Sequence, residues 1–169
     1  EIAKGKPDAI TMNKGAAMRF MPKHAGSIPF IIQQMAPRPD APTFADHATV
    51  EEVAALGADA IAVAMFLKGD HEMGYIRHLS AVVREAERYG LPVIPPIYPL
   101  TSGDEKLAIT HDPEDIFYCV RMGIEMGVDV IKVPFTGDTA TFKNIVDICP
   151  VPIVAAGGPA CDTLDDAVT

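Results

Sequence analysis

Short apolar runs rich in Val and Ile recur along the chain, and stretches with helical periodicity separate them. Strands that are buried on both faces of a parallel sheet have this continuous hydrophobic character, whereas half-exposed strands alternate. We expect six strands, at residues 9–13, 29–35, 60–66, 92–98, 130–135 and 152–156. The helical pattern covers residues 49–56, 71–89, 113–126 and 139–148. The link between 13 and 27 is too irregular to assign, and a last helix is expected to begin near Asp162.

Turn-forming residues support these boundaries. Gly57, Gly90 and Gly127 each follow a predicted helix and precede an apolar run, as does the stretch CPVP that begins at Cys149. Glycine in this place lets the chain leave the helix in a left-handed conformation, and proline cannot continue a helix. Side chains suited to capping a helix N-terminus precede three of the helices. These capping residues are Thr49, Asp112 and Asp138.

This alternation of strand and helix predicts an α/β fold with a parallel sheet and right-handed crossovers, either a barrel or an open doubly wound sheet. No GxGxxG or GxxxxGK[ST] pattern opens a strand–helix turn, which disfavours the nucleotide-binding form of the open sheet. We therefore expect a (β/α)8 TIM barrel, a fold of about 250 residues. Residues 1–169 would form a single partial domain covering roughly strands 2 to 7. Because its sheet edges would be exposed, we expect the isolated segment to aggregate or to be inactive.

Composition narrows the classes of partner. Acidic residues outnumber basic ones by 23 to 14, and no basic stripe is present, so nucleic acid is not expected as a partner. The three cysteines form no CxxC pair, which argues against a disulfide framework or a zinc site and favours a reducing, cytoplasmic location. The chain contains no apolar run of 18 residues and no basic–apolar leader, so no membrane association is expected.

Lys132 lies inside the apolar run 130–135, where a charged side chain is unusual. A lysine in a core strand must desolvate its ammonium group, and it avoids that cost by pairing with an anion or by losing its proton. A neutral amine can attack a ketone or aldehyde and form an iminium. The alternative is a structural lysine whose aliphatic part lies in the sheet while its amino group reaches a carboxylate or the barrel mouth.

Tyr98 ends the predicted strand 92–98, and active sites of parallel barrels lie at the carboxyl ends of their strands. Its phenol could pass a proton to and from a substrate hydroxyl, a step that aldol cleavage requires. The alternative is a structural tyrosine with its ring in the core and its hydroxyl at the surface.

Gly157 and Gly158 directly follow the last predicted strand and precede the last predicted helix. Paired glycines let a phosphate approach backbone N–H groups, and loops after the late strands are the usual phosphate site of a barrel. The alternative is a plain tight turn. Lys14 and Lys68 also lie just beyond strand ends, but we leave both out of the predicted site. We interpret His78 as part of the solvated face of a long amphipathic helix.

Two stretches of this sequence resemble the archaeal-type class I fructose-bisphosphate aldolases, the family grouped with deoxyribose-phosphate aldolase. The first is DVIKV from Asp129 to Val133, followed by TGD, and the second is CPVPIVAAGGP from Cys149 to Pro159. The resemblance implies a TIM barrel in which Lys132 is the Schiff-base lysine, Tyr98 is the acid/base tyrosine, and Gly157 and Gly158 bind phosphate.

The activity that this resemblance implies is the reversible cleavage of fructose 1,6-bisphosphate to dihydroxyacetone phosphate and glyceraldehyde 3-phosphate. It implies no metal or organic cofactor, because a covalent lysine iminium replaces it, and a ring-shaped homo-oligomer. The family's first-strand catalytic aspartate and its eighth-strand phosphate loop have no counterpart in this segment. Pro96 stands where fructose-bisphosphate aldolases tend to have Trp, and the chain contains no Trp. A 2-amino-3,7-dideoxy-heptulosonate synthase, a phosphosugar thiolase and a non-catalytic phosphosugar-binding barrel remain the alternatives.

Overall fold

The computed structural model describes residues 2–35, 45–101 and 108–157. Its strands are β1 Ile10–Asn13, β2 Phe30–Gln33, β3 Ala60–Ala62, β4 Met65–Leu67, β5 Ile97–Pro99, β6 Ile131–Val133 and β7 Ile153–Ala155. Its α-helices are α1 Lys14–His24, α2 Val50–Ala55, α3 Glu72–Tyr89, α4 Pro113–Met126 and α5 Thr139–Ile148, and a short 3-10 helix covers Ile2–Gly5. The helix expected near Asp162 lies outside the described residues.

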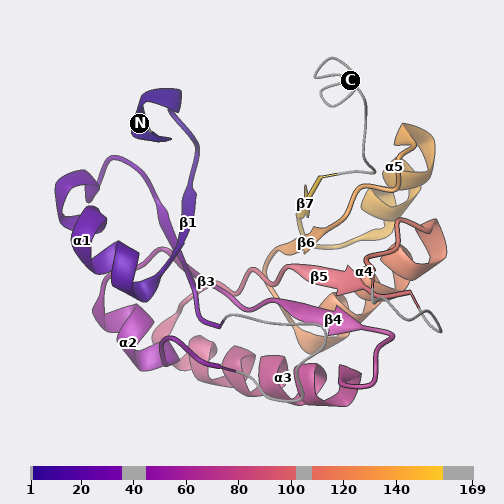
Figure 1. The fold of residues 1–169 in the computed structure, drawn as a ribbon, viewed down its shortest axis with the longest axis horizontal. Coiled ribbons are helices and arrows are strands. Elements are labelled where there is room, and N and C mark those ends of the chain that lie inside the picture. Colours follow the sequence, from indigo (N-terminus) through magenta and orange to yellow (C-terminus); the bar gives the residue numbers. More distant parts are fainter. Residues whose placement is uncertain (1, 36–44, 102–107, 158–169) are drawn as a thin grey trace.

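All strand pairs are parallel, and together they form one curved layer. The ladders join β1 to β2 and β2 to β3, then β4 to β5, and β6 to β7. Single parallel bridges complete the connection, from Ile61 to Val93 and from Pro96 to Lys132. Figure 1 shows the strands along a curve, with helices on its outer side and β1 and β7 at its two ends. The predicted alternation of parallel strands and helices is confirmed.

All the predicted strands are shorter than expected, and two of them are also interrupted. The run 60–66 is divided into β3, which pairs with β2, and β4, which pairs with β5. The run 92–98 forms regular strand only at its end, in β5. Pro92, Pro95 and Pro96 have no N–H to donate, so this segment joins its neighbours mainly by accepting hydrogen bonds. The N–H of Ile61, for example, donates to the carbonyl of Pro92 at 2.9 Å.

The four predicted helices are present, and the capping residues act as expected. Thr49 forms a reciprocal capping box with Glu52, while Asp112 and Asp138 accept backbone N–H groups of the first helical turns. One helix, α1, was not predicted. Its sequence includes Pro22 and lacks a strong helical pattern, but Ala17 and Met21 are buried. Tertiary packing therefore decides this helix rather than intrinsic propensity.

The hydrophobic core lies between the sheet and the helices. Alternate residues of the segment 61–67 are almost fully inaccessible, at 0–1% exposure, and they belong to this core. Gly123 of α4 permits a close approach to β6, because a Cβ atom there would lie 2.8 Å from the Cδ1 atom of Ile131. A larger residue at 123 would push the helix away from the sheet.

Two aspartates link neighbouring strands by hydrogen bonds at the amino ends of the strands. Asp59 accepts the N–H of Phe30 at 2.8 Å, and its own N–H donates to the carbonyl of the same residue at 2.9 Å. Asp129 forms the same pair of bonds with Val93, at 2.8 Å and 3.1 Å. Both aspartates end a Gly-x-Asp turn after a helix. Each turn thus ends a helix and also fixes the start of the preceding strand.

Candidate active site

A cavity of about 370 Å³ lies on the inner face of the curved sheet. Its polar or ionisable side chains are Thr11 of β1, Gln33 of β2, Tyr98 of β5 and Lys132 of β6. Its apolar lining consists of Ile31, Ala62, Ala64, Ile94, Pro96, Val130 and Val154. Two residues named from the sequence, Lys132 and Tyr98, therefore contribute to one cavity.

Lys132 occupies the central position of β6, and the strand alternation directs it into this cavity. Its neighbours Ile131 and Val133 are fully buried in the core, whereas Lys132 is half-buried. The backbone of Lys132 is held on both sides of the strand, since its N–H donates to the carbonyl of Pro95 at 3.1 Å and it is in register with Val154. Within the described ranges, its amino group makes no ion pair.

Tyr98 lies on the adjacent strand, two residues beyond Pro96, which bridges to Lys132. Its ring packs against Phe66 of β4, with the ring centroids 5.6 Å apart and the planes tilted by 30°. Burial raises the pKa of the Tyr98 phenol above its ordinary value, because the charged phenolate would lose solvation. The hydroxyl therefore keeps its proton at neutral pH, which suits a group that donates a proton in the reaction.

Gly157 lies just beyond β7 and has a φ of 93°, a value that favours glycine. Its carbonyl accepts the N–H of Phe135 at 2.6 Å, which ties the segment after β7 to the segment after β6. Gly158, the other predicted phosphate-binding residue, lies outside the described residues. The role of both glycines stays a prediction.

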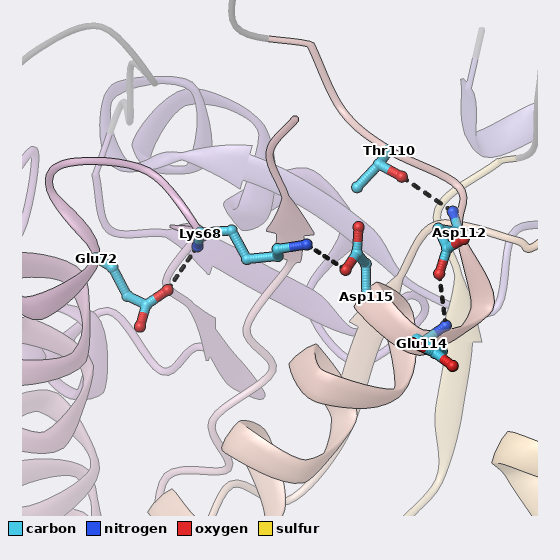
Figure 2. Close-up of polar contacts among 6 residues, drawn as sticks. All are labelled: Lys68, Glu72, Thr110, Asp112, Glu114 and Asp115. Atoms are coloured by element: carbon cyan, nitrogen blue, oxygen red, sulfur yellow. Dashed lines mark hydrogen bonds and ion pairs between the residues drawn. The ribbon is translucent and has the colours of Figure 1, made fainter. Parts of the chain in front are cut away.

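The two lysines left out of the predicted site are both paired. Lys14 forms an ion pair with Glu52, whose pKa is lowered mainly by this hydrogen bond. Lys68 forms an ion pair with Asp115 of α4, and that hydrogen bond raises the pKa of Lys68. Figure 2 shows the Lys68 side chain extending from the end of β4 to Asp115, while its backbone N–H meets Glu72. Each of these lysines is thus held by a carboxylate.

The interpretation of His78 as a solvated residue was wrong. Its ring is only 17% exposed, and its Nε2 atom lies 3.0 Å from Oε1 of Gln34 and 3.4 Å from a carboxylate oxygen of Asp46. Gln34 itself is buried. Gln34 and Asp46 come from outside α3, and helical periodicity carries no information about contacts with other segments.

Sequence reasoning did not find Thr11 and Gln33. Their signal was the strand parity, because residues two apart on a strand share a face. Gln33 donates through Nε2 to the carbonyl of Met35 at 3.2 Å. In the part of the chain that the structure describes, no group of three or more His, Cys, Asp or Glu side chains could hold a metal ion. No helix in these same ranges is long and apolar enough to cross a bilayer.

The sequence is similar to those of several known enzymes. The chain is 33% identical over 165 residues to a 2-amino-3,7-dideoxy-D-threo-hept-6-ulosonate synthase of Halobacterium salinarum, which covers 96% of this chain and 61% of the relative. It is 28% identical over 163 residues to a class 1 fructose-bisphosphate aldolase of Thermoproteus tenax, which covers 94% of this chain and 60% of the relative. The chain thus spans about three fifths of the length of these relatives.

Solved structures agree with the sequence relatives. An archaeal fructose 1,6-bisphosphate aldolase matches with a TM-score of 0.81 and 27% identity, over 95% of this chain and 63% of that one. A related structure, with a TM-score of 0.80 and 27% identity over the same shares, has its catalytic Lys covalently bound to a carbinolamine intermediate. These matches confirm the TIM-barrel fold, and the chain covers part of such a barrel. The DeoC/LacD family aldolase model matches residues 1–169, and the chain belongs to that family.

Proposed function

We propose that this protein is a class I aldolase that cleaves a phosphorylated ketose, fructose 1,6-bisphosphate in the first instance, through a Schiff base on Lys132. The observation that carries the proposal is the position of Lys132, in the centre of β6 and facing a cavity that it shares with Tyr98. The cavity walls around it are mostly apolar. Once deprotonated, an amine in this place can attack the carbonyl of a substrate bound in the cavity.

The reaction begins when the Nζ atom of Lys132 attacks the C2 carbonyl of the ketose. The resulting carbinolamine loses water and becomes an iminium, whose positive nitrogen draws electrons from the neighbouring bonds. A water molecule then takes the proton of the C4 hydroxyl, the C3–C4 bond breaks with release of glyceraldehyde 3-phosphate, and the electron pair of that bond moves to the iminium to form an enamine. Protonation at C3 and hydrolysis release dihydroxyacetone phosphate and restore the amine.

Tyr98 is proposed to relay the protons of these steps. It lies on the strand beside Lys132, and its raised pKa keeps the phenol protonated until a substrate oxygen needs the proton. A proton relay of this kind contributes typically about 10² to 10⁴ in rate. Backbone N–H groups of Gly157 and Gly158 are proposed to hold a substrate phosphate, because glycine lets an anion approach the backbone closely.

A second candidate uses the same lysine in a synthase reaction that joins a ketose phosphate fragment to another carbonyl compound. The Halobacterium relative, named as a heptulosonate synthase, supports it at 33% identity, against 28% for the Thermoproteus aldolase. The absence of Trp from the sequence supports it as well, because Pro96 borders the cavity where fructose-bisphosphate aldolases tend to have that residue. Both candidates share the covalent step and differ in the acceptor.

The test is borohydride trapping of the purified protein containing residues 1–169 with dihydroxyacetone phosphate and, separately, with fructose 1,6-bisphosphate. Peptide mass mapping should find a reduced adduct on Lys132 and none on Lys68, which serves as the internal control. Product analysis with a set of acceptor aldehydes then separates the aldolase from the synthase. If folded protein gives no adduct on any lysine, aldolase chemistry on these sugars is wrong, and a phosphosugar-binding barrel becomes the better interpretation.

A further inference from the structure

Three aromatic rings lie side by side in space at the end of the sheet where Tyr98 is found. The ring of Phe66 is 5.6 Å from that of Tyr98 and 5.7 Å from that of Tyr75, the latter at an interplanar angle of 74°. Both distances lie in the range at which aromatic pairs attract one another. Phe66 is therefore the middle ring, in contact with both tyrosines.

Phe66 faces Tyr98 because the two residues are register partners on adjacent strands, β4 and β5. Partners in a parallel ladder present their side chains on the same face of the sheet. Phe66 is 9% exposed and Tyr75 is 2% exposed, whereas Tyr98 is half-buried and lines the cavity. The Tyr98 ring thus has a fixed aromatic wall on one side and the cavity on another.

The segment that carries Phe66 is itself held firmly. Lys68, two residues later, has a φ of 65°, a conformation that is unfavourable for a residue with a side chain. It is held there by its N–H bond to Glu72 and its ion pair with Asp115 (Figure 2). Glu72 also accepts the hydroxyl of Tyr118 at 2.8 Å. These contacts fasten the turn between β4 and α3 to helix α4, so Phe66 has little freedom to move.

We infer that Phe66 is a positioning residue that fixes the Tyr98 phenol for proton transfer; this inference rests on the proposed function. A proton relay needs heavy atoms about 2.6 to 3.2 Å apart, and a displacement of about 1 Å can lower a rate by about a hundredfold. Without the Phe66 ring, the Tyr98 side chain gains room to rotate away from the substrate. Phe66 itself touches no reacting atom.

The test is a double-mutant cycle in the purified protein, with turnover measured beside borohydride trapping. Phe66→Leu should lower kcat about tenfold, change KM by less than about twofold, and leave the yield of the Lys132 adduct unchanged. In a Tyr98→Phe background, the same substitution should have almost no further effect. Phe66→Tyr, which keeps the ring, should retain wild-type turnover, and Phe66→Met provides a variant of closer volume should Phe66→Leu fold poorly.

Phe142→Leu is the matched control. Phe142 forms a comparable aromatic pair with Phe135, at 5.2 Å and 69°, but it lies on α5 away from Tyr98, so its loss should leave turnover unchanged. An equal fall in kcat for Phe66→Leu in both backgrounds would mean a merely structural role and would overturn the inference, as would no fall at all. A wild-type protein without any Lys132 adduct would instead overturn the proposed function, and this inference with it.

Discussion

Two lysines near the ends of parallel strands have opposite surroundings. Lys68 directly follows β4, where its backbone turns, and its amino group meets the carboxylate of Asp115. Lys132 lies within β6, where strand alternation turns its side chain into a cavity with mostly apolar walls. The carboxylate raises the pKa of Lys68 and keeps it protonated, which prevents nucleophilic attack. The surroundings of a lysine thus depend on its position in the strand and on its partner, and these surroundings are what the proposed function uses.

The largest expected effect comes from replacing the lysine in the cavity. Lys132→Met should abolish the borohydride adduct and lower turnover by at least about a thousandfold, because the covalent step is lost. The free energy of unfolding should not fall, since Met fits the apolar walls. Lys68→Met is the matched control for the covalent step and should keep the adduct. A residual adduct in Lys132→Met would show that another lysine carries the chemistry.

Replacing the proposed proton relay should have the second largest effect. Tyr98→Phe should lower kcat by about a hundredfold while the Lys132 adduct with dihydroxyacetone phosphate still forms, because the relay acts on bond cleavage and proton exchange. Steady-state turnover assays, run beside borohydride trapping, would separate adduct formation from bond cleavage. Unchanged kcat in a variant that traps normally would remove Tyr98 from the mechanism.

The cluster of Lys68, Glu72, Asp115 and Tyr118 should contribute to the stability of the fold. Tyr118→Phe removes the hydrogen bond to Glu72 and should lower the free energy of unfolding by about 1 kcal/mol at neutral pH. Burial, followed by that hydrogen bond, raises the pKa of Tyr118 to about 12. Since this value lies above the ordinary pKa of about 10, the stabilisation is complete below pH 10 and is lost as the pH rises through 12.

Urea unfolding of wild type and Tyr118→Phe at pH 8 and at pH 11 measures this dependence. The difference between the two proteins should be smaller at the higher pH. A difference that grows with pH would contradict the sign of the shift.

The smallest expected effect is that of the ion pair itself. Asp115→Asn should lower the free energy of unfolding by only about 0.5 kcal/mol, because the pair is partly exposed and is screened by salt. Lys68 should still give no borohydride adduct in this variant, since it does not line the cavity. An adduct on Lys68 in Asp115→Asn would mean that the carboxylate alone distinguishes the two lysines.

Much of the fold could be predicted because buried parallel strands and capped helices have local signatures. The strands near Ile31 and Ile131 and the caps at Thr49, Asp112 and Asp138 lie where the pattern indicated. Helix α1 could not be predicted in this way, since its stability comes from burying Ala17 and Met21 against the sheet. The division of the run 60–66 depends on which neighbour each half pairs with, and no local pattern encodes a partner.

The candidate site was predictable to a similar degree. Lys132 stood out because a charge in an apolar strand needs an explanation. Only the structure shows that its side chain faces the cavity. Its catalytic role and that of Tyr98 stay predictions. Phe66 gave no such signal, because an apolar residue in an apolar strand is ordinary. Its contact with Tyr98 depends on the register between β4 and β5, which only the three-dimensional structure supplies.

The paired hydrogen bonds of Asp59 and Asp129 each join one strand–helix unit to the unit that follows it in the chain. They join residues 29 and 36 positions apart, so each needs only one strand, one helix and the next turn to be present. Each new unit is thereby secured to the one synthesised before it, without waiting for later parts of the chain. A ribosome that releases the protein from its N-terminus therefore presents these units in the order in which they can assemble.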